Sequence, residues 1–197
     1  MAAACAAEAQ TCDGRASFNF SPTHIEGGTM LRGGGRHLGL AAGHGSDDLF
    51  AIASLGQRTF DGQRSYVMAA MIGANQPVRL DNRLHVCPMA SVGYVSAVRS
   101  GAETRGRGAA AADVRVGWLA ANTPRLAVIP TFGVGAQLNG LHAAGAVPHA
   151  GRSGSLSAGV GLVFRNRVSI VPGISVAVAG VGGGAALRVA AAYNLRR

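Results

Sequence analysis

The chain has 197 residues, of which 48% are hydrophobic, only 5% aromatic and 14% charged, and 30 are glycine. Soluble globular domains usually carry about 25% charged residues, so this composition argues against an ordinary soluble helical protein. The formal net charge is +9, but the arginines that supply it are scattered rather than clustered with aromatic residues, so we expect no nucleic-acid partner.

The first residues, MAAACAAEAQTC, are similar to the end of a secretory signal peptide, because AEA, ending at Ala9, is an A-x-A cleavage pattern. We therefore expect residues 1–9 to be a residual signal-peptide tail and residues 10–197 to be a single domain. A disordered alanine-rich tail with no role is the alternative.

Cleavage after Ala9 removes Cys5 and leaves two of the three cysteines, Cys12 and Cys87. An even pair of cysteines in an exported protein predicts a disulfide between them. Two unpaired buried thiols are the alternative.

Beyond the tail, apolar residues recur at every second position, which is typical of β-strands. In SLSAGVGLVF, for example, Leu156, Val160 and Leu162 alternate with serine and glycine. The pattern predicts about ten strands, with eight as the alternative count. Their expected spans are 14–22, 36–44, 49–59, 63–74, 84–97, 108–120, 124–138, 153–165, 167–178 and 184–195.

The connections between these strands alternate in character. GSDD, ANTPR and RNR are short and polar, whereas the connections at 22–35, 98–107, 139–152 and 179–183 are mostly longer and richer in glycine, alanine and arginine. The short turn at 61–62 and the long connection at 75–83 depart from this alternation. Short turns at one end and longer loops at the other predict an antiparallel up-and-down β-barrel.

Four segments carry a resemblance to a known family: CPMASVGY, TPRLAVIPTFGVGAQL, GLVFRNRVSIVPGISVAV and the closing AALRVAAAYNLRR. Together they resemble the small β-barrel proteins of the bacterial outer membrane. The resemblance implies an all-β transmembrane barrel with a structural, adhesive or narrow-pore, porin-like role. It also implies contacts with outer-membrane lipid and lipopolysaccharide, and with the assembly machinery that reads the last strand, where Tyr193 and Leu195 occupy outward positions.

A membrane barrel needs one apolar face towards lipid and permits a polar face towards its lumen. We predict that the following residues face outward: Leu126, Val128, Phe132, Val134, Leu156, Val160, Leu162, Val176, Leu187 and Val189. The rival interpretation is a soluble lipocalin-like barrel that binds a small apolar ligand, in which such side chains would line the cavity. Pro130 and Pro172 each remove a donor from the hydrogen-bond ladder, so both are expected at a bulge or near a rim.

Asp113, Arg115 and Arg188 are expected to face the lumen near the middle of their strands. An isolated charge is costly there, so the sequence predicts ion pairs among them. These pairs form either an interior plug or a charged gate.

The longer connections hold more arginines than acids. Guanidinium groups bind phosphate through paired hydrogen bonds, so contacts with anionic lipid at the outer end are predicted, with simple solvated loop charges as the alternative. The arginines concerned are Arg99, Arg105, Arg107 and Arg152, together with Arg32, against the acids Glu26 and Glu103.

The sequence offers no catalytic, metal-binding or cofactor-binding motif. GVGGGA at 180–185 superficially fits a dinucleotide loop, but the chain ends before the helix, strand and acidic residue that such a fold needs. Nothing in the spacing of Asp61, Glu103, His142 and His149 supports a hydrolytic site at the outer rim. We therefore expect no enzyme activity and no cofactor.

Overall fold

The computed structural model describes Cys12 and residues 23–45, 49–60, 62–78, 83–98, 106–141, 151–165, 167–180 and 184–195. These residues form ten long strands: β1 (Thr23–Arg32), β2 (Gly35–Gly45), β3 (Leu49–Phe60), β4 (Gln63–Ala74), β6 (Leu84–Val98), β7 (Arg107–Trp118), β9 (Leu126–Leu141), β10 (Gly151–Phe164), β11 (Val168–Gly180) and β12 (Ala185–Asn194). Two short strands, β5 (Gln76–Pro77) and β8 (Ala121–Asn122), complete the set.

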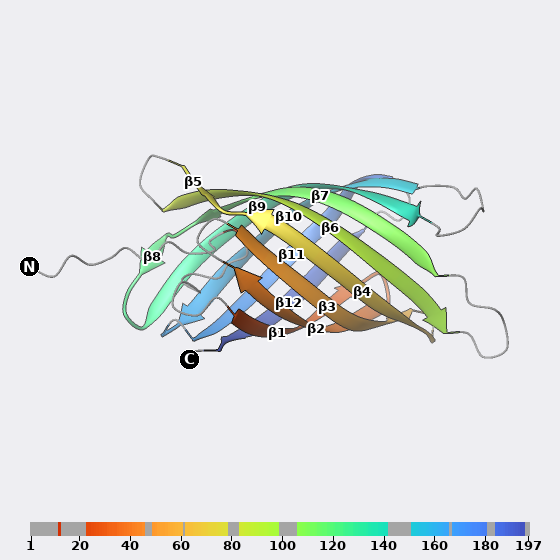
Figure 1. Ribbon diagram of the computed structural model, residues 1–197, viewed down its shortest axis with the longest axis horizontal. Helices are drawn as coiled ribbons and strands as arrows, with labels where there is room; N and C mark the ends of the chain where they lie inside the picture. Colours follow the sequence, from red (N-terminus) through yellow and green to blue (C-terminus); the bar gives the residue numbers. More distant parts are fainter. Residues whose placement is uncertain are drawn as a thin grey trace, which may run out of the picture.

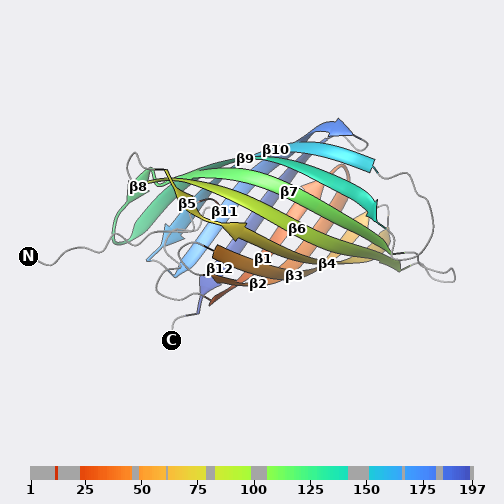
Figure 2. The ribbon, with the colours of Figure 1, turned by 45° about the horizontal axis from the view of Figure 1, so that its top comes forward.

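The ten long strands close into one antiparallel barrel (Figures 1 and 2). Each pairs with its neighbours along the chain, and β12 pairs with β1 to close the ring. Closure leaves no long strand with an unpaired edge. The predicted all-β up-and-down barrel is therefore confirmed, with the larger of the two expected strand counts.

The loop expected at 22–35 was predicted wrongly. We expected a strand at 14–22, which lies outside the described residues, and a loop at 22–35; the structure has β1 at Thr23–Arg32 instead. Two glycines at 27–28 interrupt the alternation in THIEGGTMLR and hide the strand. Hydrogen bonds to β12 and β2 on both sides hold it in place, and Gly33 and Gly34, both with positive φ, make the tight turn to β2.

The two ends of the barrel differ. At one end, called the loop end, the strands β1, β3, β6, β9 and β11 finish and the strands β2, β4, β7, β10 and β12 begin; it lies at the right in Figure 1. The other, called the terminus end, is where β1 begins and β12 ends, and it also holds β5 and β8. The strand ends that flank the three longer connections predicted after residue 97 all lie at the loop end. The described residues contain no helix that is long and apolar enough to cross a membrane.

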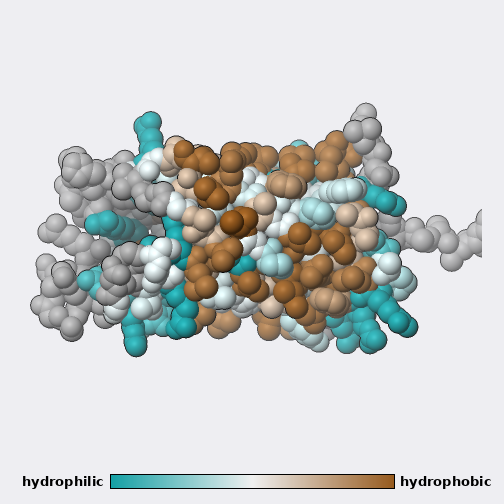
Figure 3. Space-filling model, turned by 180° about the vertical axis from the view of Figure 1, so that it is seen from behind, coloured by the Kyte–Doolittle hydropathy of each residue, from teal (hydrophilic) through white to brown (hydrophobic). Residues whose placement is uncertain are grey.

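The outer face of the barrel is apolar. Large apolar side chains on it include Leu40, Phe132 and Leu187, which are 73%, 63% and 59% exposed. Figure 3 shows the resulting band on the rear face, with hydrophilic residues gathered at both ends of the barrel. Most of the side chains predicted to face outward are exposed here: Phe132, Val134, Leu156, Val160, Val176, Leu187 and Val189. In a lipocalin-like barrel these side chains would line the cavity, whereas here they lie on the outer face.

Proline lies in three of the long strands, and each one falls where a ladder is interrupted. Pro130 lies between the part of β9 that pairs with β7 and the part that pairs with β8. Pro88 lies between the parts of β6 that pair with β4 and with β5. Pro172 lies in a gap of the pairing between β10 and β11. A missing backbone donor costs little at such gaps, which explains why the strands tolerate proline.

Candidate functional site: the barrel lumen

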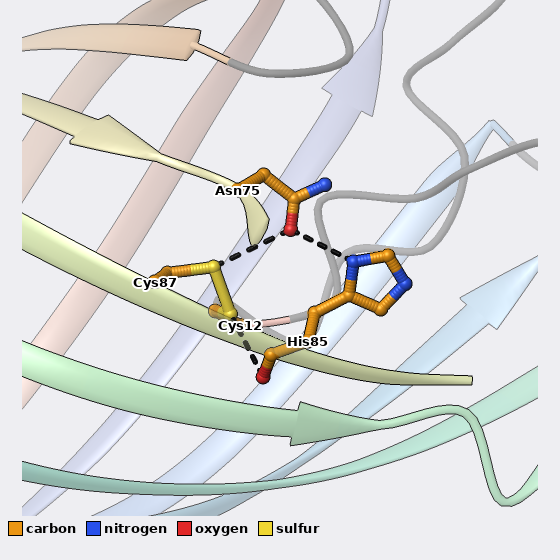
Figure 4. The surroundings of a disulfide bond; sticks show 4 residues. All are labelled: Cys12, Asn75, His85 and Cys87. Carbon is orange, nitrogen blue, oxygen red and sulfur yellow. Dashed lines mark hydrogen bonds between the residues drawn. A yellow bond between two sulfur atoms is a disulfide. The ribbon is translucent and has the colours of Figure 1, made fainter. Parts of the chain in front are cut away.

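A disulfide lies inside the barrel near the terminus end (Figure 4). It joins Cys12 to Cys87 on β6, the pair considered from the sequence, and both residues are buried. The side-chain oxygen of Asn75 lies 3.4 Å from Sγ of Cys87 and accepts a hydrogen bond of 3.0 Å from Nδ1 of His85. The backbone oxygen of His85 lies 3.5 Å from Sγ of Cys12. The disulfide thus ties the chain at Cys12 to the inner wall.

Apolar side chains fill the lumen around this disulfide. Phe50, Ile52 and Met89 pack against the two cysteines, and Ala127, Ile129 and Val163 form a separate cluster with Leu119. These residues lie in the halves of their strands nearest the terminus end. Side chains normally fill the interior of barrels with so few strands. The terminus half of the lumen is therefore packed like a protein core.

Buried polar groups close the seam between the first and last strands. His24 on β1 lies directly opposite Asn194 on β12, and each is 1% exposed. The His24 ring lies across Gly43 on β2, so close that a β-carbon on this glycine would collide with the ring. A larger residue at 43 would displace the ring and open the seam.

Charged side chains line the middle of the lumen. Asp113, Arg115 and Arg188 all line one cavity of about 220 Å³. Arg115 and Arg188 also line a second cavity of about 310 Å³, together with Glu26 and His37. The structure thus brings the three residues singled out from the sequence around one space. Their pairing in ion pairs stays a prediction.

Two glycines on β9 make room for these charges. Gly135 lies opposite Asp113, and a β-carbon there would collide with the carboxylate. Gly133 lies opposite Arg115, and a β-carbon there would be 2.9 Å from Cγ of the arginine and 2.6 Å from Oγ of Ser157. The alternating glycines of TFGVGAQL are thus matched to the alternating charges of ADVRVG. Only the cross-strand register reveals this match.

Sequence reasoning missed Glu26 and His37 as residues of the lumen. Glu26 was assigned to a loop, but it lies on β1 with its side chain directed inward. The register places Arg188, Met30 and His37 side by side on β12, β1 and β2. The run of three glycines at 33–35 was the available signal in the sequence, because a turn there would have placed a strand on either side of it.

The loop end carries an arginine ring. Six exposed arginines lie at the ends of strands there: Arg32, Arg36, Arg58, Arg64, Arg107 and Arg152. Of the five arginines predicted to contact anionic lipid, Arg32, Arg107 and Arg152 lie in this ring, and Arg99 and Arg105 lie outside the described residues. The only acids among the described residues are Glu26 and Asp113, both half-buried. The described part of this rim is therefore strongly positive.

The residues weighed for a hydrolytic site, Asp61, Glu103, His142 and His149, all lie outside the described residues. Within the described part of the chain, no group of three or more histidine, cysteine, aspartate or glutamate side chains could hold a metal ion.

Three solved structures show what the chain is similar to. The NanC porin matches with 7% identity and a TM-score of 0.46, over 88% of this chain and 100% of that chain. The β domain of the Bordetella autotransporter BrkA matches with 12% identity and a TM-score of 0.40, over 88% and 98% of the two chains. The translocator domain of the autotransporter NalP from Neisseria meningitidis matches with 13% identity and a TM-score of 0.40, over 88% and 86%.

No protein-family model matches the sequence, and no curated protein matches it. Identities this low say nothing about function, which has to be inferred from the residues of this chain.

Proposed function

We propose that the protein is an integral β-barrel of the bacterial outer membrane with a structural or adhesive role, and that its lumen is too full to serve as an open diffusion pore. The observation that carries the proposal is the apolar outer face. Soluble monomers rarely expose an apolar patch larger than about 300–600 Å², whereas here large exposed apolar side chains occur on all ten long strands. Lipid is the solvent that suits such a surface, because a closed sheet satisfies its own backbone groups.

The packed terminus half of the lumen supports a role without bulk diffusion. The disulfide, the two apolar clusters and the buried polar seam all lie there. Side chains fill the interior of barrels with about eight strands, whereas barrels with about 16–18 strands leave an aqueous channel, and ten strands lie nearer the filled case.

Export of the chain with a signal peptide in a Gram-negative host tests the membrane assignment. We expect the barrel in the outer-membrane fraction, released by detergent but not by high salt or alkaline washing. Recovery as a soluble periplasmic protein would overturn the assignment. In planar bilayers the purified protein should give no steady conductance; a stable open channel would refute the closed lumen while leaving the membrane assignment intact.

We further propose that the positive loop end faces outward and contacts lipopolysaccharide. The exposed Arg107 and Arg152 support this proposal, since guanidinium groups suit phosphate. Replacing Arg99, Arg105 and Arg107 with serine should weaken lipopolysaccharide binding, and the difference from the parent should shrink at high salt because exposed charges are screened. Equal binding by both proteins at every salt concentration would contradict it.

The last strand is proposed as the segment that the outer-membrane assembly machinery reads. Two observations support this proposal: β12 closes the barrel against β1, and Tyr193 and Leu195 at its end are exposed on the outer face.

A further inference from the structure

A hollow of about 1500 Å³ interrupts the outer face over β1, β2, β3, β4, β6 and β12. The central strands β2, β3, β4 and β6 lie side by side (Figure 2). The hollow arises from a row of small residues, Ala42, Ala53 and Ala70, which lie directly opposite one another on β2, β3 and β4. The next row towards the loop end is large and apolar: Leu40, Leu55, Met68 and Tyr94. We call this hollow the apolar groove.

A polar row crosses the loop end of the apolar groove. Arg36 on β2, Thr59 on β3 and Arg64 on β4 lie directly opposite one another in register. Both arginines are exposed. Each lies two residues beyond a groove residue on the same face, Leu38 for Arg36 and Tyr66 for Arg64. Since neighbouring strands are spaced about 4.8 Å apart, the backbones of the two arginines lie about 10 Å from each other on either side of Thr59, and their side chains can converge on one group above it.

We infer that the apolar groove and the row Arg36–Thr59–Arg64 form one site for a phosphorylated lipid. The phosphate lies between the two guanidinium groups, with the Thr59 hydroxyl as a further donor, and an acyl chain lies in the groove below. Arginine suits this role because its planar donors match phosphate oxygens in pairs. The inference rests on the proposed membrane location and deepens it by assigning a particular lipid chemistry to one face of the barrel.

Size and charge favour a lipid over other occupants. The volume exceeds the roughly 300–1,000 Å³ of pockets for small molecules, which suits a long acyl chain rather than a compact solute. A second copy of the chain, related by a two-fold axis along the membrane normal, would bring Arg36 and Arg64 of both copies together, and like charges facing each other oppose that arrangement.

Native mass spectrometry of the detergent-solubilised barrel tests the site. The probes are phosphatidylglycerol and phosphatidylcholine with identical acyl chains, together with inorganic phosphate alone. We expect phosphatidylglycerol to be retained at least about tenfold more tightly than phosphatidylcholine, because both lipids carry the phosphate but the choline ammonium of the second is repelled by the two guanidinium groups. Inorganic phosphate should not be retained, since it lacks the chain that fills the groove.

Two double variants separate the parts of the site. Arg36→Gln with Arg64→Gln should abolish the preference for phosphatidylglycerol. Ala53→Leu with Ala70→Leu fills the groove while keeping it apolar, and should lower the retention of both lipids. The matched control, Arg125→Gln with Arg167→Gln, removes two exposed arginines at the terminus end, away from the groove, and should leave the preference unchanged.

Three results would overturn the site. The parent protein could retain both lipids equally, or the control variant could lose the preference for phosphatidylglycerol as fully as the Arg36 and Arg64 variant does. The protein could also form a dimer in which the second copy covers the groove and excludes lipid from it. Insertion of the parent into vesicles, measured in the same series, keeps the two proposals apart. A barrel that inserts but shows no preference refutes the site alone, whereas a barrel that does not insert refutes the membrane location.

Discussion

Replacing Leu55 with arginine would test whether the outer face lies in lipid. Leu55 lies at the middle of β3 and is 64% exposed, and Leu49 lies on the same face at the terminus end of the same strand and is 63% exposed. Leu49→Arg is therefore a matched control: the strand, the face, the exposure and the added charge are the same. Only the position along the barrel axis differs.

The expected magnitude follows from that difference in position. Antiparallel strand rises about 3.4 Å per residue, so the two leucines are about 20 Å apart along β3. With a strand tilt of about 40°, this becomes about 15 Å along the axis, which places Leu49 at or beyond the edge of an apolar band about 25 Å tall. An outward arginine costs about 2–4 kcal/mol at the midplane and about 0–1 kcal/mol near the interface. Leu55→Arg should therefore cost about 2 kcal/mol more than Leu49→Arg.

The free energy of unfolding can be measured by guanidinium chloride titration of the barrel folded into phospholipid vesicles, with extrapolation to zero denaturant. Trp118 reports the transition, because it is the single tryptophan and lies exposed on the outer face. Equal costs at the two positions, or no cost at either, would refute the claim that this face is immersed in lipid.

Three further outcomes are expected. Intact mass of the non-reduced protein should be two hydrogens below that of the reduced form, and Cys12→Ser or Cys87→Ser should lower the free energy of unfolding by about 2–4 kcal/mol; two free thiols would refute the disulfide. A double-mutant cycle of alanine variants at Asp113 and Arg115 should give a coupling of about 1 kcal/mol in unfolding, whereas additive effects would show that the two charges are not paired. Tyr193→Ala should slow barrel assembly in cells, followed by the shift in gel mobility on heating, more than alanine at an outward tyrosine of another strand does; equal rates would argue against recognition of the last strand.

The sequence by itself determined the alternation and therefore the two faces. Val189 and Arg188, for example, are neighbours on β12, yet the first is exposed outside and the second lines the lumen. The alternation also predicted the bounds of a strand where it was unbroken: residues 63–74 were expected as a strand and form β4. A period of two is a local property, so the chain displays it without reference to its neighbours.

Cross-strand register was decided only by the tertiary structure. The first strand escaped detection because glycines interrupt its own pattern, while its place is fixed by β12, more than 150 residues away in the chain. The apolar groove exists because three alanines from different strands fall in one row, and the lumen charges fit because glycines stand opposite them. Shifting one strand by a single residue would move all its side chains to the other face, and no single strand carries the information that prevents this shift. Hydrogen bonding around the closed ring supplies that information, since every strand must match both neighbours at once.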